Sequence, residues 1–247
     1  MATASMTAAA CIRSRHALSG SILRFFLAAA GDVPIQDIAP LPEADESANA
    51  RLSSFLLSSP RSLARMTRRL TQSALAPAFL EADFSSLPAR LIVLPGKQLG
   101  ELAVYAGLAM HCRAVAAVVN GKDVHALRAA FGDAAHQFAV LRAPFFLREP
   151  ERLAAALCGR AAEQPDIEEL VSRVKRAGLA CLSACAAALP PALEALFERK
   201  LAALSFRGMG IAPSGLFLES EEKYSLHALL EKLLRKELEQ KWNPSCS

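Results

Sequence analysis

The spacing of hydrophobic residues along the chain predicts a protein built mainly of α-helices. From Gln98 onward, apolar residues recur three or four positions apart, which places them on one face of a helix. These residues are Leu99, Leu102, Ala103, Ala106 and Met110. The same spacing returns in the segments 60–75, 149–160, 166–189, 192–204 and 224–242. We therefore expect a mainly α fold, a single compact multi-helix domain with room for a short strand or two.

Turn-forming residues divide these helical segments. Asn120-Gly121 predicts a turn, after which Asp123 is the expected cap of a new helix that ends at Gly132 in a left-handed conformation. Upstream, the run Leu91–Leu94 fits either a short strand or the approach to the next helix, and Pro95 suits a first helical turn. Both alternatives for this run stay open.

The N-terminal part of the chain differs in composition from the rest. Residues 32–49 hold three prolines and five acidic residues, which is typical of an extended linker. Residues 1–31 carry three arginines and no acid, a composition shared by organelle transit peptides and by unstructured leaders. We expect a variable, flexible segment over 1–49, a helical domain over 50–242 that ends in an amphipathic helix, and a tail over 243–247.

Basic residues are concentrated in one segment, although the net charge of the whole chain is only +4. Between Ala48 and Leu80 there is no acidic residue, and four arginines lie on or beside the polar face of the helix expected over 60–75. They are Arg61, Arg65, Arg68 and Arg69. This arginine face is either a solvated helix surface or a docking surface for an acidic partner or an anionic membrane. A nucleic-acid binder ranks last, because interleaved aromatic residues and a strong positive charge are missing.

Reactive residues in the chain do not form a recognised catalytic or metal-binding motif. Gly96-Lys97 resembles the end of a phosphate loop, but Leu91 replaces its first glycine and Gln98 replaces its Ser or Thr. The six cysteines form no C-x-x-C pair, which favours free thiols in a reducing compartment. We expect no enzyme activity, no cofactor and no metal. A thiol or metal protein that uses Cys112, Cys181 and Cys185 is kept as an alternative, as is a pairing of Cys112 with His136.

The segment from Phe84 to Leu147 resembles the SctK (YscK-like) family of type III secretion accessory proteins. The resemblance begins with R-L-x-x-L-P at Arg90–Pro95 and a leucine- and alanine-rich helix that ends near His111. It continues with V-x-A-L-R-A-A-x-G at Val124–Gly132 and F-A-V-L-R-A-P at Phe138–Pro144. These are packing motifs, so they carry no information about a reaction.

The resemblance implies a helical, non-catalytic adaptor in the bacterial cytoplasm, at the cytoplasmic face of the inner membrane. Its implied partners are an SctD-like inner-ring protein and an SctQ-like pod protein, with an SctL-like stator and an SctN-like ATPase contacted indirectly. No nucleic acid is implied, and the membrane is reached through partners only. Our candidate partner-binding surfaces are the arginine face and the C-terminal helix through Trp242. An organelle-targeted helical enzyme or assembly factor is the competing hypothesis, motivated by the acid-free leader.

Overall fold

The described part of the chain is helical, with turns between the helices. The computed structural model describes residues 61, 82–83, 86–94, 96–159, 166–204 and 218–238. No β-strand occurs among them, which confirms the mainly α prediction. The α-helices are α7 (Leu87–Ile92), α8 (Gly96–Met110), α9 (Cys112–Ala116), α10 (Gly121–Phe131), α11 (Asp133–Leu141), α12 (Pro150–Cys158), α13 (Ile167–Ala186), α14 (Pro191–Leu204) and α15 (Ser220–Leu233). A 3-10 turn, η1 (Ala143–Phe145), and a π-helical turn, η2 (Leu234–Leu238), complete the set.

The chain divides into two compact units. One contains residues up to Pro95 together with Leu189–Leu196, and its described core includes Leu91 and Ile92 of α7. Leu91 and Ile92 end helix α7 and the next two residues form a turn, so the strand alternative for this run is wrong. The other unit contains Gly96–Ala188 and Phe197–Ser247, so that α14 begins in the first unit and ends in the second.

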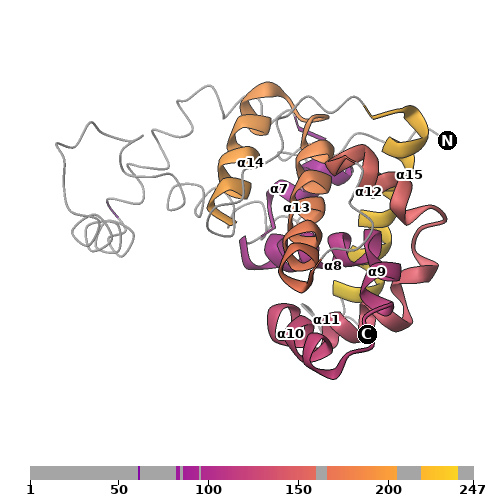
Figure 1. Ribbon diagram of the computed structural model, residues 1–247. Coiled ribbons are helices and arrows are strands. Elements are labelled where there is room, and N and C mark those ends of the chain that lie inside the picture. The colour runs from indigo at the N-terminus through magenta and orange to yellow at the C-terminus, as the bar shows by residue number, and fades with distance from the viewer. Residues whose placement is uncertain are drawn as a thin grey trace. The chain divides into compact units, whose positions relative to one another are not determined.

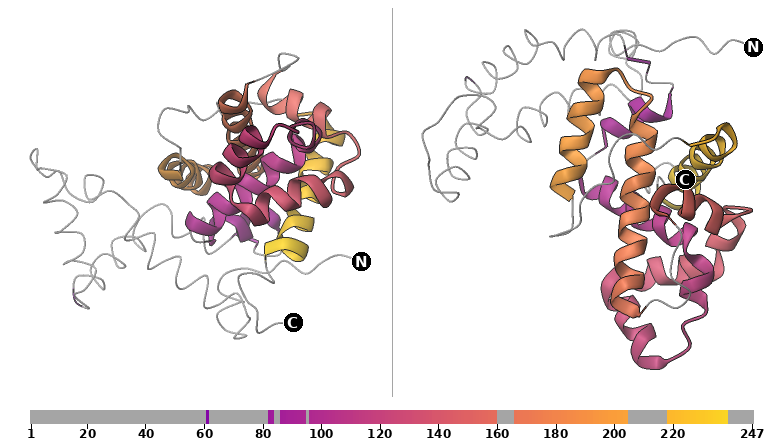
Figure 2. Two further views of the ribbon diagram at one scale, coloured as in Figure 1. Left: turned by 60° about the horizontal axis from the view of Figure 1, so that its bottom comes forward. Right: turned by 45° about the horizontal axis from the view of Figure 1, so that its top comes forward.

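Helix α8 is the centre of the second unit. The five residues of its predicted apolar stripe are all buried, as the spacing indicated. Tyr105, Leu108 and Ala109 are buried as well, so α8 is enclosed on more than one face. Its most extensive neighbour is α13, which crosses it in Figure 1. In Figure 2, α10 and α11 gather at one end of α13.

Two glycines make this crossing possible. A Cβ atom at Gly107 of α8 would overlap the backbone carbonyl of Val174 in α13. Reciprocally, a Cβ atom at Gly178 of α13 would overlap the carbonyl of Ala103 in α8. The two helix backbones are therefore in direct contact, and only hydrogen fits at either position. Glycine inside a helix normally lowers stability, but here it is needed because the two helix backbones approach each other so closely.

Side-chain caps fix several helix ends. The Asn120 side chain accepts a hydrogen bond from the backbone N–H of Lys122 (3.2 Å), so Asn120 caps α10 and the assignment of the cap to Asp123 is wrong. Asn120, in an extended conformation, supplies the acceptor three residues earlier than expected, and Asp123 lies in the first turn instead. Gly132 ends α10 with a positive φ of 88°, as expected for a glycine at this position. Its ψ of 156° lies outside the left-handed helical region, so the expected left-handed helical conformation is not adopted.

The end of the described chain differs from its predicted form. Helix α15 begins four residues before the expected start at Tyr224, because the backbone N–H of Glu219 donates to the Glu222 carboxylate (3.0 Å) and completes a capping box. After Leu233 the helix continues as the π-helical turn η2. Trp242 lies outside the described residues, and so does Pro95 at the start of α8.

Candidate functional site

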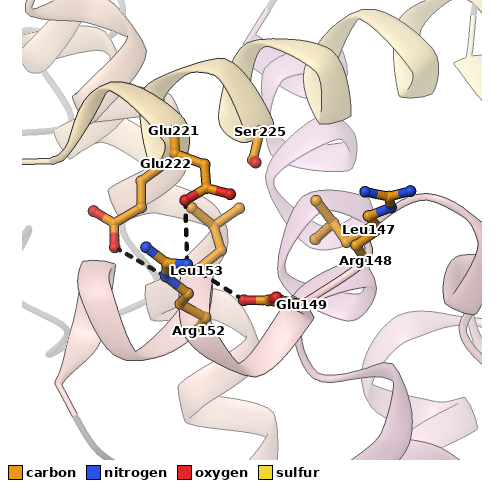
Figure 3. A pocket seen from close by; sticks show the side chains of 8 residues that line it. All are labelled: Leu147, Arg148, Glu149, Arg152, Leu153, Glu221, Glu222 and Ser225. Atoms are coloured by element: carbon orange, nitrogen blue, oxygen red, sulfur yellow. Dashed lines mark hydrogen bonds and ion pairs between the residues drawn. The ribbon is translucent and has the colours of Figure 1, made fainter.

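An arginine surrounded by carboxylates is the densest polar cluster in the described chain. Arg152 on α12 lies 3.2 Å from Glu221, 3.4 Å from Glu219, 3.5 Å from Glu149 and 3.9 Å from Glu222. Figure 3 shows three of these carboxylates converging on its guanidinium. We call these five residues the Arg152 cluster. It brings the beginning of α12 together with the beginning of α15.

The local sequence explains why acids gather at this point. Glu149 is the N-cap residue of α12, while Glu219 and the two glutamates that follow it occupy the N-cap and first turn of α15. Negative side chains are favoured at helix N-termini, where backbone N–H groups are unpaired and the helix dipole is positive. Two such termini lying side by side concentrate negative charge. Arg152 partly neutralises it and ties α12 to α15.

Four residues of the cluster line a shallow pocket of about 130 Å³, namely Glu149, Arg152, Glu221 and Glu222. Leu147, Arg148, Leu153 and Ser225 complete its wall (Figure 3). The carboxylates raise the pKa of Arg152, first through the charge of Glu221 and then through the hydrogen bond to Glu149, so the guanidinium stays charged. With Arg148, which also lines the pocket, two arginines stand against the four carboxylates of the cluster, which leaves a smaller excess of negative charge. The arrangement suits contact with a cationic group and contains no activated nucleophile.

The cysteines of the thiol hypothesis do not converge on one centre. Cys181 and Cys185 are buried on α13, and burial raises the pKa of both thiols, that of Cys185 to about 12. Cys112 is buried on α9, and burial raises its pKa as well. In the described ranges, no group of three or more His, Cys, Asp or Glu side chains could hold a metal ion.

A cysteine–histidine contact does exist, but it is not the pair considered from the sequence. Sγ of Cys185 lies 4.0 Å from Nε2 of His227 on α15, whereas no hydrogen bond joins Cys112 to His136. A nucleophilic cysteine needs a lowered pKa, because the thiolate is the reactive form. Since the pKa of Cys185 is raised, this contact is a packing contact between α13 and α15.

His111 stands at the break between α8 and α9. Its backbone (φ −110°, ψ 17°) leaves the helical conformation, in agreement with the expected helix that ends near His111. Its Nε2 atom is buried without a hydrogen-bond partner. The pKa of His111 is lowered to about 4, first by burial and then by the positive charge of Arg173, while Glu151 opposes both. The imidazole is therefore neutral in the folded protein.

Acid should destabilise the protein through His111. Its pKa is about 4 when folded and 6.5 when unfolded, so the unfolded state takes up the proton first. The contribution of His111 to the free energy of unfolding is therefore fully present above pH 6.5 and decreases as the pH falls toward about 4. Below about pH 4 this contribution changes no further. The loss is at most about 3.5 kcal/mol, since the two pKa values differ by about 2.5 at roughly 1.4 kcal/mol per pKa unit. Urea unfolding from about pH 7 to pH 4 measures it.

A substitution at His111 isolates this contribution. We expect His111→Phe to flatten the pH dependence over that interval, while His125→Phe, at an exposed position of α10, leaves it as in the wild type. An unchanged slope in the His111 variant would contradict the assignment.

The partner-binding residues predicted from the sequence fall almost entirely outside the described ranges. Arg65, Arg68, Arg69 and Trp242 are not described, and Arg61 is helical and exposed. The sequence reasoning did not find the Arg152 cluster or the ion pair between Arg142 and Glu237 (2.7 Å). The residues that form these contacts are far apart in the chain. The only feature of the sequence that could have indicated the cluster was the presence of acidic residues at the N-termini of two helices.

The fold and the cluster together define a helical domain that carries its charged groups at its surface. The family model described as YOP proteins translocation protein K (YscK) matches residues 44–247, and the chain belongs to this family of type III secretion proteins. This confirms the resemblance seen in the sequence. No curated protein and no solved structure matches the chain. Within the described residues, no helix is long and apolar enough to cross a membrane.

Proposed function

We propose that this protein is a non-catalytic adaptor of a type III secretion system, which links an SctD-like inner-ring protein to an SctQ-like pod protein. The observation that carries the proposal is the family match over residues 44–247. The helical core and the raised cysteine pKa values accord with a role in binding rather than catalysis. The adaptor works without a cofactor, at the cytoplasmic face of the inner membrane, and contacts the SctL-like and SctN-like proteins indirectly.

The adaptor role requires at least two separate surfaces, one for each partner. We assign one to the arginine face and one to the C-terminal helix through Trp242, within a helical domain over 50–242. Positive charge on the arginine face favours an acidic partner surface and gives orientation and fast association more than raw affinity. Exposed Arg61 lies at the start of this face.

Charge reversal on the arginine face should weaken the adaptor's binding to one partner. We expect the triple variant Arg65→Glu, Arg68→Glu and Arg69→Glu to reduce co-purification of either the ring or the pod protein by about tenfold or more, and to leave the other bound. The matched control changes the net charge equally at exposed positions elsewhere: Lys122→Glu, Arg128→Glu and Lys223→Glu. Equal co-purification by the two triple variants would remove the arginine face from the proposal.

The adaptor role itself is tested in the native bacterium. Deletion of the gene should abolish secretion and detach the pod protein from the inner-membrane fraction, and the wild-type gene supplied in trans should restore both. Secretion that continues normally in the deletion strain would overturn the proposed function.

A further inference from the structure

Six leucines of α15 and η2 form a continuous buried stripe, which we call the leucine stripe. Each is at most 3% exposed, and α15 packs against α8, α12 and α13. They are Leu226, Leu229, Leu230, Leu233, Leu234 and Leu238. Because the stripe repeats one residue type at helical spacing, it specifies which face of the helix is buried. It does not specify how far along its own axis the helix lies.

A slide of about one turn shows how similar the alternative positions are. If α15 and η2 moved along their axis by four residues, about 6 Å, each stripe position would receive the residue four places further on. Leucine would replace leucine at positions 226, 229, 230 and 234, and Trp242 would replace Leu238. Of the six stripe positions, one would receive a charge, because Glu237 would take the place of Leu233.

The slide in the opposite direction meets the same obstacle at the other end of the stripe. Glu222 would then take the place of Leu226, and Ser225 that of Leu229. Slides of three residues in either direction would bury several charged side chains, so they compete less well. Glu222 and Glu237 are therefore the charged residues that distinguish the observed position of α15 from its two nearest competitors.

In the observed position, each of these glutamates lies beside an arginine from another helix. The Glu237 side chain is 6% exposed and lies 2.7 Å from Arg142, which follows α11. The Glu222 side chain is 13% exposed and lies 3.9 Å from Arg152 on α12 (Figure 3). A slide would carry both glutamates away from their arginines and bury one of them among leucines. A buried charge without a counter-charge is strongly unfavourable.

A third polar contact of α15 does not distinguish the positions. The Lys232 ammonium donates to the Phe146 carbonyl (3.3 Å). After a slide that brings Glu237 to the place of Leu233, Lys236 would occupy the place of Lys232 and could make the same contact. The selection between positions therefore depends on the two glutamates.

We propose that the pairs Glu237–Arg142 and Glu222–Arg152 form a register lock, which selects one position of α15 along its axis where the leucine stripe allows several. A buried ion pair adds little net stability compared with apolar residues, and fixing register is the best-attested role of such groups. The lock determines where the exposed side of α15, with Tyr224, lies on the domain. This inference goes beyond the adaptor function and holds whether or not that function is correct.

Nuclear magnetic resonance of two matched double variants tests the register lock. Glu222→Leu with Glu237→Leu extends the leucine stripe at both ends, whereas Glu222→Gln with Glu237→Gln removes the same charges and keeps polar side chains. We expect the leucine variant to show a second set of α15 and η2 amide signals from about 10% of the molecules or more, against less than about 1% in the wild type. The glutamine variant should show one set, because an amide group buried among leucines is still unfavourable.

A nuclear Overhauser cross-peak identifies the second set of signals. Sγ of Cys185 lies 4.0 Å from Nε2 of His227, so protons of these two residues are close in the observed position. A slide of four residues removes His227 from Cys185, and we expect their cross-peak in the main set but not in the second. The ratio of the two sets should not depend on protein concentration, since the slide occurs within one molecule. A second set that grows with concentration would identify association between copies and overturn the proposal.

Two further results would contradict the register lock. A single set of signals in the leucine variant, with the cross-peak retained, would mean that packing alone fixes α15. Equal doubling in the leucine and glutamine variants would mean that loss of charge loosens the helix without any role for the stripe.

The single variant Glu237→Leu provides a second measurement, because it leaves the Arg152 cluster intact. We expect its second set to be smaller than that of the leucine double variant and larger than that of the wild type. A population equal to that of the wild type would remove Glu237 from the lock and overturn the proposal.

Discussion

Replacing Gly178 with alanine is expected to destabilise the protein by about 3 kcal/mol or more. The added Cβ atom would overlap the Ala103 carbonyl, which belongs to a helix backbone and cannot rotate away. Overpacking usually costs about 1–3 kcal/mol, and here helices α8 and α13 must separate along their most extensive contact. Urea unfolding of the variant measures the loss, and Gly107→Ala should behave alike.

A third glycine provides the control for this prediction. At Gly100 of α8 an added Cβ atom would lie 3.9 Å from the Leu204 side chain, which is ordinary contact. Alanine is favoured over glycine inside a helix by about 1 kcal/mol, so Gly100→Ala should leave stability unchanged or raise it. Equal changes in stability for Gly100→Ala and Gly178→Ala would contradict the close approach of the α8 and α13 backbones.

Replacing Arg142 with methionine is expected to cost about 2–3 kcal/mol near pH 8. Arg142 forms an ion pair with Glu237 (2.7 Å), whose side chain is only 6% exposed and belongs to η2. Removing one partner of a fully buried pair costs about 3–5 kcal/mol, and the smaller figure applies because the Arg142 side chain is 55% exposed. Without Arg142, the Glu237 carboxylate would be buried without its counter-charge.

The pH dependence of this loss identifies its cause. Burial raises the pKa of Glu237, and the charge of Arg142 lowers it again in part, so the pKa rises further in the variant. A carboxylate with a raised pKa destabilises the fold where it is ionised and ceases to do so once it is protonated. The deficit against wild type should therefore shrink as the pH falls from about 8 to 5. The double variant Arg142→Met, Glu237→Gln should recover most of the stability, and a deficit that persists in it would contradict the assignment.

Much of the candidate surface lay beyond sequence reasoning for a simple reason. The arginine face was visible because its members are close together in the sequence. The Arg152 cluster combines α12 with α15, and the pair Arg142–Glu237 combines the end of α11 with η2. Each charge by itself resembled an ordinary solvated residue, and only the packing of distant helices brings these partners within reach of one another.

The sequence by itself determined the helical class, most helix boundaries, the apolar stripe of α8 and the family. These features depend on neighbours within a few positions, since helix periodicity, turns and caps are local. The tertiary structure decided that Phe146 is buried while Phe145 is exposed, and that Gly107 and Gly178 meet the opposite backbone. Those outcomes depend on which helix lies opposite, and residue spacing along one helix specifies a face without specifying what covers it.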